Sequence, residues 1–344
     1  MERRATLADV AKRAGVSSTT ASFVLTNRPG TRIAEATAER IRAAAAELQY
    51  RPDPTARSLR TGRTQAVGFV SDEVTLTRYA SPMIRGIMDV CAARDHVLIM
   101  TETDSRLDEL ETAVRVLQTR RVDGLLLGLM RARRITLPQV RSSTPLILVN
   151  GLASGRAAVL PDEERGGREA IDHLLAAGHT RIAFIGRPSE ELDLDVWATI
   201  GRRLSGIDRG MAEAGLTFVH EVSGGLGAWE PELGYTGALE VFDSADVTAI
   251  LAFNDRVAMG VYQAAQERGL TIPDELSVMS FDDEQLASYL RPPVTTMRLP
   301  YLEMGRVAMA QLLDGEGGVL PGGAVRETLV PMPLIERVSV RRLN

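Results

Sequence analysis

Short apolar runs alternate with helical segments along most of this chain, and that alternation limits its fold more than any other feature. Seven runs have the length of buried strands: 66–70, 97–100, 124–129, 146–149, 181–185, 249–253 and 277–281. Longer segments with apolar residues at helical spacing are 81–94, 107–119, 166–177, 204–214 and 257–268. Apolar runs separated by helices are typical of parallel sheets covered on both faces. Because the series is too long for one small sheet, the sequence predicts two α/β subdomains.

The first 64 residues differ from the rest in charge. They hold eleven arginines and Lys12 against six carboxylates, a net charge of +6, whereas the whole chain carries −5. The remaining 280 residues therefore carry −11. A small basic segment on a large acidic body indicates a nucleic-acid module joined to another domain. The alternative is a solvated, charged helix face.

The same basic segment has the pattern of three short helices. Thr6–Asp9 fits a capping box, and Gly15 ends the helix that follows. Ser17 is the next N-cap candidate, for a helix to about Leu25 that begins with small hydroxyl residues. Two helices joined by a short turn with glycine are typical of a helix-turn-helix unit, and a third helix is predicted over 34–48. Hydroxyl side chains can reach phosphates and base edges in the major groove. The alternative is a plain three-helix bundle that binds protein.

Polar residues stand where several predicted strands end. Asn150, Asn254 and Asp282 each follow directly on a strand, and a loop after another strand leads to Arg203. Ligands of open parallel sheets bind beyond the carboxyl ends of the strands. A carboxylate accepts two hydroxyl hydrogen bonds and an arginine donates two, so this set suits vicinal hydroxyls. Trp229, in a glycine-rich loop, adds an indole face for a sugar ring or a base.

Several ordered motifs resemble the lac-repressor (LacI/GalR) family of bacterial transcription regulators. Near the N-terminus they are Thr6-Leu7-Ala8-Asp9-Val10-Ala11, Ala14-Gly15-Val16-Ser17, Thr20-Ala21-Ser22 and Leu48-Gln49-Tyr50-Arg51-Pro52. In the body they are Gly178-His179-Thr180-Arg181-Ile182, Phe253-Asn254-Asp255-Arg256, Ser280-Phe281-Asp282-Asp283 and Arg291-Pro292-Pro293-Val294-Thr295-Thr296. The resemblance covers nearly the whole chain.

This resemblance implies a small all-α helix-turn-helix headpiece and an α/β effector domain like the periplasmic binding proteins, with two parallel-sheet subdomains and three crossovers. We expect the headpiece at 1–50, a hinge helix or linker at 51–64, and an effector-binding and dimerisation domain at 65–344. Within that domain, the expected subdomains are about 65–163 plus 298–326 and about 164–297 plus 327–344. By composition alone, the basic stretch led by Pro52 and Pro54 is a linker.

The resemblance also assigns site residues. The expected DNA-binding residues are Thr6, Leu7, Ser17, Ser18, Thr19, Thr20, Ser22, Thr26, Ala56 and Leu59. The expected effector-binding residues are Tyr79, Asn150, Arg203, Trp229, Asn254, Asp282 and Tyr301. Leu59 is expected to wedge into the minor groove where two hinge helices pack at Ala56. Phe23 departs from the family, most of whose members carry a guanine-reading arginine there. Its packing into the core is favoured over contact with a thymine methyl.

Each of these residues also has an ordinary structural interpretation. Asp282 is a candidate helix cap, and Asn254 a simple turn after its strand. Trp229 is a candidate loop anchor, and Tyr301 is a candidate core residue. His179 is expected to be a structural turn residue rather than a ligand. Arg202 and Arg256 are expected in surface ion pairs, with Arg256 alternatively facing an anionic ligand.

Motifs of enzymes and metal sites are absent from the sequence. The four histidines have no zinc spacing, there is no Gly-x-Ser-x-Gly, and Lys12 is the single lysine and cannot complete a Walker loop. Cys91 is the single cysteine and cannot form an intramolecular disulfide. We therefore expect no enzyme, cofactor or metal. No apolar run approaches the roughly 20 residues that span a bilayer, and no signal peptide is apparent, so a cytoplasmic protein without membrane partners is expected.

The resulting prediction is a sequence-specific DNA-binding regulator, a repressor controlled by a small-molecule effector bound between the two subdomains. A sugar or sugar derivative is the expected effector, and a nucleobase is the alternative. We expect a homodimer on a palindromic double-stranded operator, and not a tetramer, because the family's extra C-terminal helix is absent. Two rival classes are a solute-binding protein, which would lack the headpiece, and an architectural protein, which would bind operator and random DNA alike.

Overall fold

The computed structural model describes residues 5–25, 32–50, 62–77, 80–104, 106–141, 143–225, 227 and 229–343. The chain divides into two compact units, Met1–Gln65 and Ala66–Asn344. No helix of the described residues is long and apolar enough to cross a membrane.

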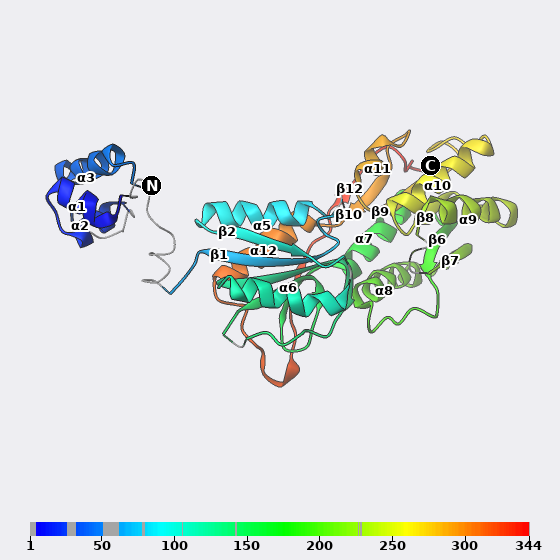
Figure 1. The fold of residues 1–344 in the computed structure, drawn as a ribbon. Coiled ribbons are helices and arrows are strands. Elements are labelled where there is room, and N and C mark those ends of the chain that lie inside the picture. The colour runs from blue at the N-terminus through cyan, green and yellow to red at the C-terminus, as the bar shows by residue number, and fades with distance from the viewer. Residues whose placement is uncertain are drawn as a thin grey trace. The chain divides into compact units, whose positions relative to one another are not determined.

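The first unit contains the three predicted helices, α1 (Leu7–Ala14), α2 (Ser18–Leu25) and α3 (Glu35–Glu47) (Figure 1). The capping box between Thr6 and Asp9 is present, and Gly15 ends α1 in the left-handed conformation at φ +64°. The hydroxyl of Ser17 accepts a hydrogen bond from the Thr20 N–H at 3.1 Å, which starts α2. The small core that these helices share consists mainly of alanines with Val10 and Ile41.

The second unit contains two six-stranded sheets, as the alternation of strands and helices predicts. The first sheet has the order β11-β5-β4-β3-β1-β2 and is parallel throughout. Its strands are β1 (Ala66–Asp72), β2 (Val97–Glu102), β3 (Gly124–Arg134), β4 (Leu146–Leu152), β5 (Ala157–Pro161) and β11 (Arg326–Val330). The second sheet has the order β12-β10-β9-β8-β6-β7, with only β12 antiparallel to its neighbour. Its strands are β6 (Ile182–Pro188), β7 (His220–Gly224), β8 (Ala249–Ala252), β9 (Ser277–Asp282), β10 (Thr295–Arg298) and β12 (Leu334–Ile335).

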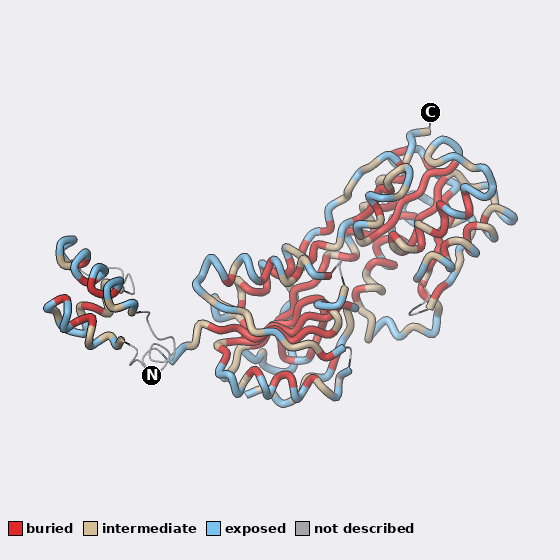
Figure 2. Tube along the Cα trace, turned by 45° about the horizontal axis from the view of Figure 1, so that its top comes forward, coloured by how far each residue is buried: buried red, intermediate tan, exposed pale blue. Residues whose placement is uncertain are grey.

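Helices cover both faces of each sheet, which makes each half a three-layer sandwich (Figure 1). On the first sheet, α5 (Pro82–Ala93) and α12 (Tyr301–Leu313) pack on one face, and α6 (Leu107–Thr119) packs on the other. On the second sheet, α7 (Glu163–Ala176) and α8 (Ala198–Glu213) pack opposite α9 (Pro231–Ser244) and α10 (Asp255–Glu267), and the short α11 (Gln285–Tyr289) follows β9. Figure 2 shows that most strands are buried along their length. The chain passes between the sheets three times, after β5, β10 and β11.

Several elements differ from the sequence prediction. Helices α9 and α12 and the strands β5, β7 and β10–β12 were not predicted, and α7 and α8 begin before the expected positions 166 and 204. Strand β7 lies at a sheet edge with alternating exposure, so it has no continuous apolar run. The first turns of α7 and α8 bury polar side chains, Glu163 and Thr199, which interrupt the apolar spacing. The first sheet also extends to Val330, past the subdomain boundary expected near 326.

Helices α7 and α8 cross at glycines. A Cβ atom on Gly206 would lie 1.9 Å from the carbonyl oxygen of Glu164, and one on Gly167 would lie 2.3 Å from that of Arg203. The two backbones are therefore in direct contact. The contact brings Glu163 of α7 beside Arg203 of α8, so the crossing positions these two side chains.

Candidate functional site

A cavity of about 370 Å³ lies in the second unit between the two sheets. Residues from the exits of β3, β4, β8 and β9 line it, as expected for parallel sheets. Six of the seven residues expected to bind an effector line this cavity: Asn150, Arg203, Trp229, Asn254, Asp282 and Tyr301. The seventh, Tyr79, lies outside the described residues.

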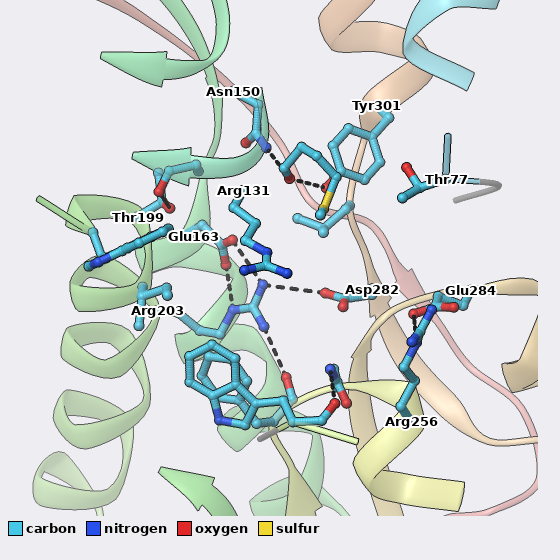
Figure 3. Close-up of a pocket in the computed structure, with 18 of the residues that line it drawn as sticks. Thr77, Arg131, Asn150, Glu163, Thr199, Arg203, Arg256, Asp282, Glu284 and Tyr301 are labelled. Carbon is cyan, nitrogen blue, oxygen red and sulfur yellow. Dashed lines mark hydrogen bonds and ion pairs between the residues drawn. The ribbon is translucent and has the colours of Figure 1, made fainter. Parts of the chain in front are cut away.

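Arg203 is the buried centre of the cavity's charge network (Figure 3). Its Nε and Nη2 donate to the two carboxylate oxygens of Glu163 at 2.7 and 2.9 Å, and its Nη1 donates to the Phe253 carbonyl at 3.0 Å. The rings of Phe253 and Phe281 lie 5.0 and 4.5 Å from the guanidinium. Burial alone would lower the pKa of Arg203, but Glu163 and Asp282 outweigh it and the pKa is raised. Arg203 therefore stays charged in a bidentate ion pair.

Asp282 directs its carboxylate into the cavity from the end of β9 (Figure 3). One of its oxygens lies 3.5 Å from Arg203 Nη2. The backbone of Asp282 has φ +98°, and that of Asp283 has φ +54°. Asp283 points elsewhere, accepting hydrogen bonds from Arg298 and Arg337 at 2.7 and 2.6 Å. The two adjacent carboxylates thus face different partners. Burial raises the pKa of Asp282 to about 7, with Arg203 acting in the opposite direction.

The buried carboxylate of Asp255 fixes the backbone beside this strand exit. It accepts hydrogen bonds from the hydroxyls of Ser280 and Thr296 at 2.5 and 2.9 Å and from the Glu284 N–H at 2.6 Å. Burial raises the pKa of Asp255 to about 8, and these three donors pull it down. Asp255 thereby ties β9, β10 and the segment after β9 together.

Trp229 offers the cavity an aromatic face and not a hydrogen-bond donor. Its indole Nε1 donates to the Gly186 carbonyl at 2.8 Å, and its ring stacks on Phe253 with centroids 4.3 Å apart. Asn254 lines the cavity and also caps α10, by accepting a hydrogen bond from the Val257 N–H at 2.8 Å. This helix cap was not predicted from the sequence.

The two remaining expected residues lie on the side of the first sheet. Asn150 has φ +59° and donates through Nδ2 to the carbonyls of Leu129 and Met130 at 3.0 and 3.1 Å. Tyr301 is buried at the start of α12, and its hydroxyl lies 3.5 Å from the Met130 carbonyl. Both side chains contact the backbone in the middle of β3, at Leu129 and Met130.

Further cavity residues were not predicted from the sequence. Trp197, Thr199, Glu163 and Arg131 line the cavity. Both tryptophans of the chain therefore face it, and the scarcity of tryptophan is the one signal that could have pointed to Trp197. Glu163 was missed because the strand before it, β5, was not predicted.

The residues interpreted as structural have structural partners. His179 lies between the Thr248 hydroxyl at 2.9 Å and the Arg341 carbonyl at 3.1 Å. Arg202 pairs with Glu327 at 2.7 Å. Arg256 pairs with Glu230 and Glu284 at 3.0 and 3.1 Å, although it also lines the cavity. No group of His, Cys, Asp and Glu among the described residues is arranged to hold a metal ion.

In the first unit, the start of α2 presents hydroxyl groups to solvent. Ser17, Ser18 and Thr19 are exposed, and Thr20 and Ser22 are half-buried. Thr6 is also exposed, whereas Leu7 packs against the core of the unit. Phe23 is half-buried. Thr26, Ala56 and Leu59 lie outside the described residues.

Both units match known protein families. Residues 6–53 match the bacterial regulatory proteins of the lacI family, and residues 171–340 match a periplasmic binding protein-like domain. The HTH-type transcriptional repressor PurR of Aliivibrio fischeri is 31% identical over 317 residues, which cover 90% of this chain and 91% of the relative. The PurR repressor of Photobacterium profundum is 33% identical over 316 residues, with the same coverage. The chain belongs to the LacI family.

Solved structures of LacI-family regulators have the same fold. The Lac repressor dimer bound to operator and the anti-inducer ONPF matches with a TM-score of 0.70 at 24% identity, over 98% of this chain and all of that one. A LacI-family transcriptional regulator from Rhizobium etli matches with a TM-score of 0.69 at 28% identity, over 81% of this chain and all of that one. This LacI-family protein is therefore a DNA-binding transcriptional regulator with a periplasmic-binding-protein-like domain.

Proposed function

We propose that this LacI-family regulator is a repressor whose operator binding is controlled by a small carbohydrate bound in the cavity. We infer the class of the effector from the Asp282 carboxylate, which lies 3.5 Å from the Arg203 guanidinium. The Trp229 ring lines the same cavity. A carboxylate accepts hydrogen bonds from neighbouring hydroxyls, and an indole face packs on the apolar face of a sugar ring. The names of the relatives as transcriptional repressors support the sign of regulation.

Control requires two states that the effector binds unequally. The cavity takes Asn150 and Tyr301 from the first sheet's side and Arg203 and Asp282 from the second sheet's side. A ligand that contacts both sides favours one relative position of the sheets over others. We propose that the protein binds a palindromic operator as a homodimer, in which Ser17 to Ser22 of each headpiece contact one half-site. The position of the sheets that the ligand favours then changes the affinity of this homodimer for the operator.

A nucleobase is the second candidate effector. The relatives named PurR favour it, and the Trp229–Phe253 stack suits a flat base as well as a sugar. Titration calorimetry of the full-length chain against a panel of carbohydrates and nucleobases separates the two. Because both tryptophans line the cavity, quenching of intrinsic fluorescence gives a second readout. Carbohydrate binding at micromolar levels supports the proposal, and binding of nucleobases alone contradicts it.

Carbohydrate binding is expected to weaken as the pH falls through 7. Burial raises the pKa of Asp282 to about 7, so its carboxylate is ionised at pH 8 and protonated at pH 6. Since the ionised form is the better hydroxyl acceptor, the affinity should be about tenfold lower at pH 6 than at pH 8. Calorimetry at both values measures this, and Asp282→Asn should remove the difference. An affinity that rises toward pH 6 would show that ionised Asp282 is not the acceptor.

A further inference from the structure

Among the described residues, three arginines line the cavity, and they differ in whether a carboxylate neutralises their charge. Arg203 is paired with Glu163, and Arg256 is paired with Glu230 and Glu284. Arg131 is exposed and lines the same cavity, and its guanidinium forms no ion pair or hydrogen bond with any described residue. Figure 3 shows Arg131 extending toward Arg203 and Asp282. A cation is thus presented to the cavity without a counter-ion from the described part of the chain.

The backbone that carries Arg131 is firmly held. It stands on β3, within the irregular register between Gly128 and Arg133. The buried carboxylate of Asp72 accepts from the Met130 N–H at 2.6 Å on one side and pairs with Arg133 at 2.8 Å on the other. The Arg134 N–H donates to the Val196 carbonyl at 2.8 Å. Because this segment is already ordered, a ligand that binds Arg131 must fix the arginine side chain but need not order the backbone.

The carboxylates of the cavity indicate which groups, besides an anionic one, a complementary ligand has. Glu163, Glu230 and Glu284 are already paired with the other two arginines. Glu73 and Asp282, the latter 3.5 Å from Arg203, can still accept hydrogen bonds from ligand hydroxyls. A guanidinium binds carboxylates and phosphates through parallel N–H···O hydrogen bonds. The complementary ligand therefore has several hydroxyls and one anionic group.

We propose that Arg131 is an anion-binding residue of the effector site and that the effector is an acidic carbohydrate, bearing a carboxylate or a phosphate. This inference rests on the proposed carbohydrate function and narrows it. Arg131 holds the anionic group, and Asp282 accepts hydroxyl hydrogen bonds at the opposite part of the ligand. Neutral sugars of the same stereochemistry would lose the contact with Arg131 and bind more weakly.

The first test uses inorganic phosphate and needs no knowledge of the effector. The melting temperature of the full-length chain is measured against phosphate at constant ionic strength, for the wild type, Arg131→Gln and Arg134→Gln. Arg134 is an exposed arginine on the same strand that does not line the cavity, so it is the matched control. We expect the melting temperature to rise with phosphate, up to saturation, in the wild type and in Arg134→Gln. In Arg131→Gln we expect no rise. An equal increase in all three proteins, or none in the wild type, would overturn the assignment of Arg131.

The second test compares hexoses with their uronic acids and their 6-phosphates by titration calorimetry. We expect one acidic member to bind roughly 10- to 100-fold more tightly than its neutral parent, and Arg131→Gln to abolish that difference. Preference for the uronic acid or for the phosphate identifies the anionic group. A neutral hexose that binds as tightly as its acid, with no effect of Arg131→Gln, overturns this inference and leaves the carbohydrate proposal standing. Binding of nucleobases with no carbohydrate of either kind overturns both.

Discussion

Replacing Arg203 with methionine is expected to lower the free energy of unfolding by about 3–5 kcal/mol, the largest effect of any single substitution in the cavity. Arg203 and Glu163 are each only 5% exposed and form a bidentate pair. Removing the arginine leaves the Glu163 carboxylate buried without its partner. Urea denaturation of the full-length chain measures the loss.

The double variant Arg203→Met/Glu163→Leu separates charge from packing. With neither charge present, stability should return to within about 1 kcal/mol of the wild type, because paired apolar residues replace buried ion pairs at little cost. Effector binding should stay lost, since the cavity then lacks its central cation. The control is Arg165→Met, which removes an exposed pair with Glu169 on α7 and should cost less than about 1 kcal/mol. A double variant as unstable as Arg203→Met would mean that packing, not charge, explains the loss.

Substituting Gly206 with alanine is expected to destabilise the protein by about 3 kcal/mol or more. The added methyl group would lie 1.9 Å from the carbonyl oxygen of Glu164, so α7 and α8 must separate. Arg203 lies on α8 less than one turn before Gly206, and separation therefore also draws it away from Glu163. We expect weaker effector binding together with the lower stability.

The control for this substitution is Gly318→Ala. Gly318 is exposed, and an added Cβ would meet no atom within 4 Å. Its unfolding free energy should stay within about 0.5 kcal/mol of the wild type. Thermal unfolding of the two variants side by side measures the difference. Equal stability of Gly206→Ala and Gly318→Ala would show that the helices can move apart without cost.

The sequence could predict those parts of the molecule in which local pattern and burial agree. Continuous apolar runs identified the central strands, and the capping box of Thr6 and Asp9 together with Gly15 located α1. The rule that ligands bind beyond strand ends placed Asn150, Asn254 and Asp282 in one cavity. These inferences required only neighbouring residues and a known property of parallel sheets.

The sequence could not predict features that depend on contacts between distant segments. Glu163 and Arg203 are separated by 40 positions and meet only because α7 and α8 cross closely at glycines. Buried polar residues at the start of both helices also interrupt the periodicity used to find them. Arg133 and Arg256 form ion pairs with Asp72 and Glu230, whereas Arg131 forms none with the described residues. This difference between residues of one type follows from the fold, so the sequence could not show it.

Selection of DNA from a random-sequence pool with the purified full-length protein is the most direct test of an effector-controlled, sequence-specific repressor. It should be carried out for the wild type and for Asp282→Asn, each with and without a mixture of carbohydrates. We predict one enriched palindrome with two half-sites, whose enrichment changes with carbohydrate for the wild type and changes less for Asp282→Asn at the same carbohydrate concentration. No enriched sequence under any condition, or enrichment that the carbohydrates leave unchanged in both proteins, would contradict it.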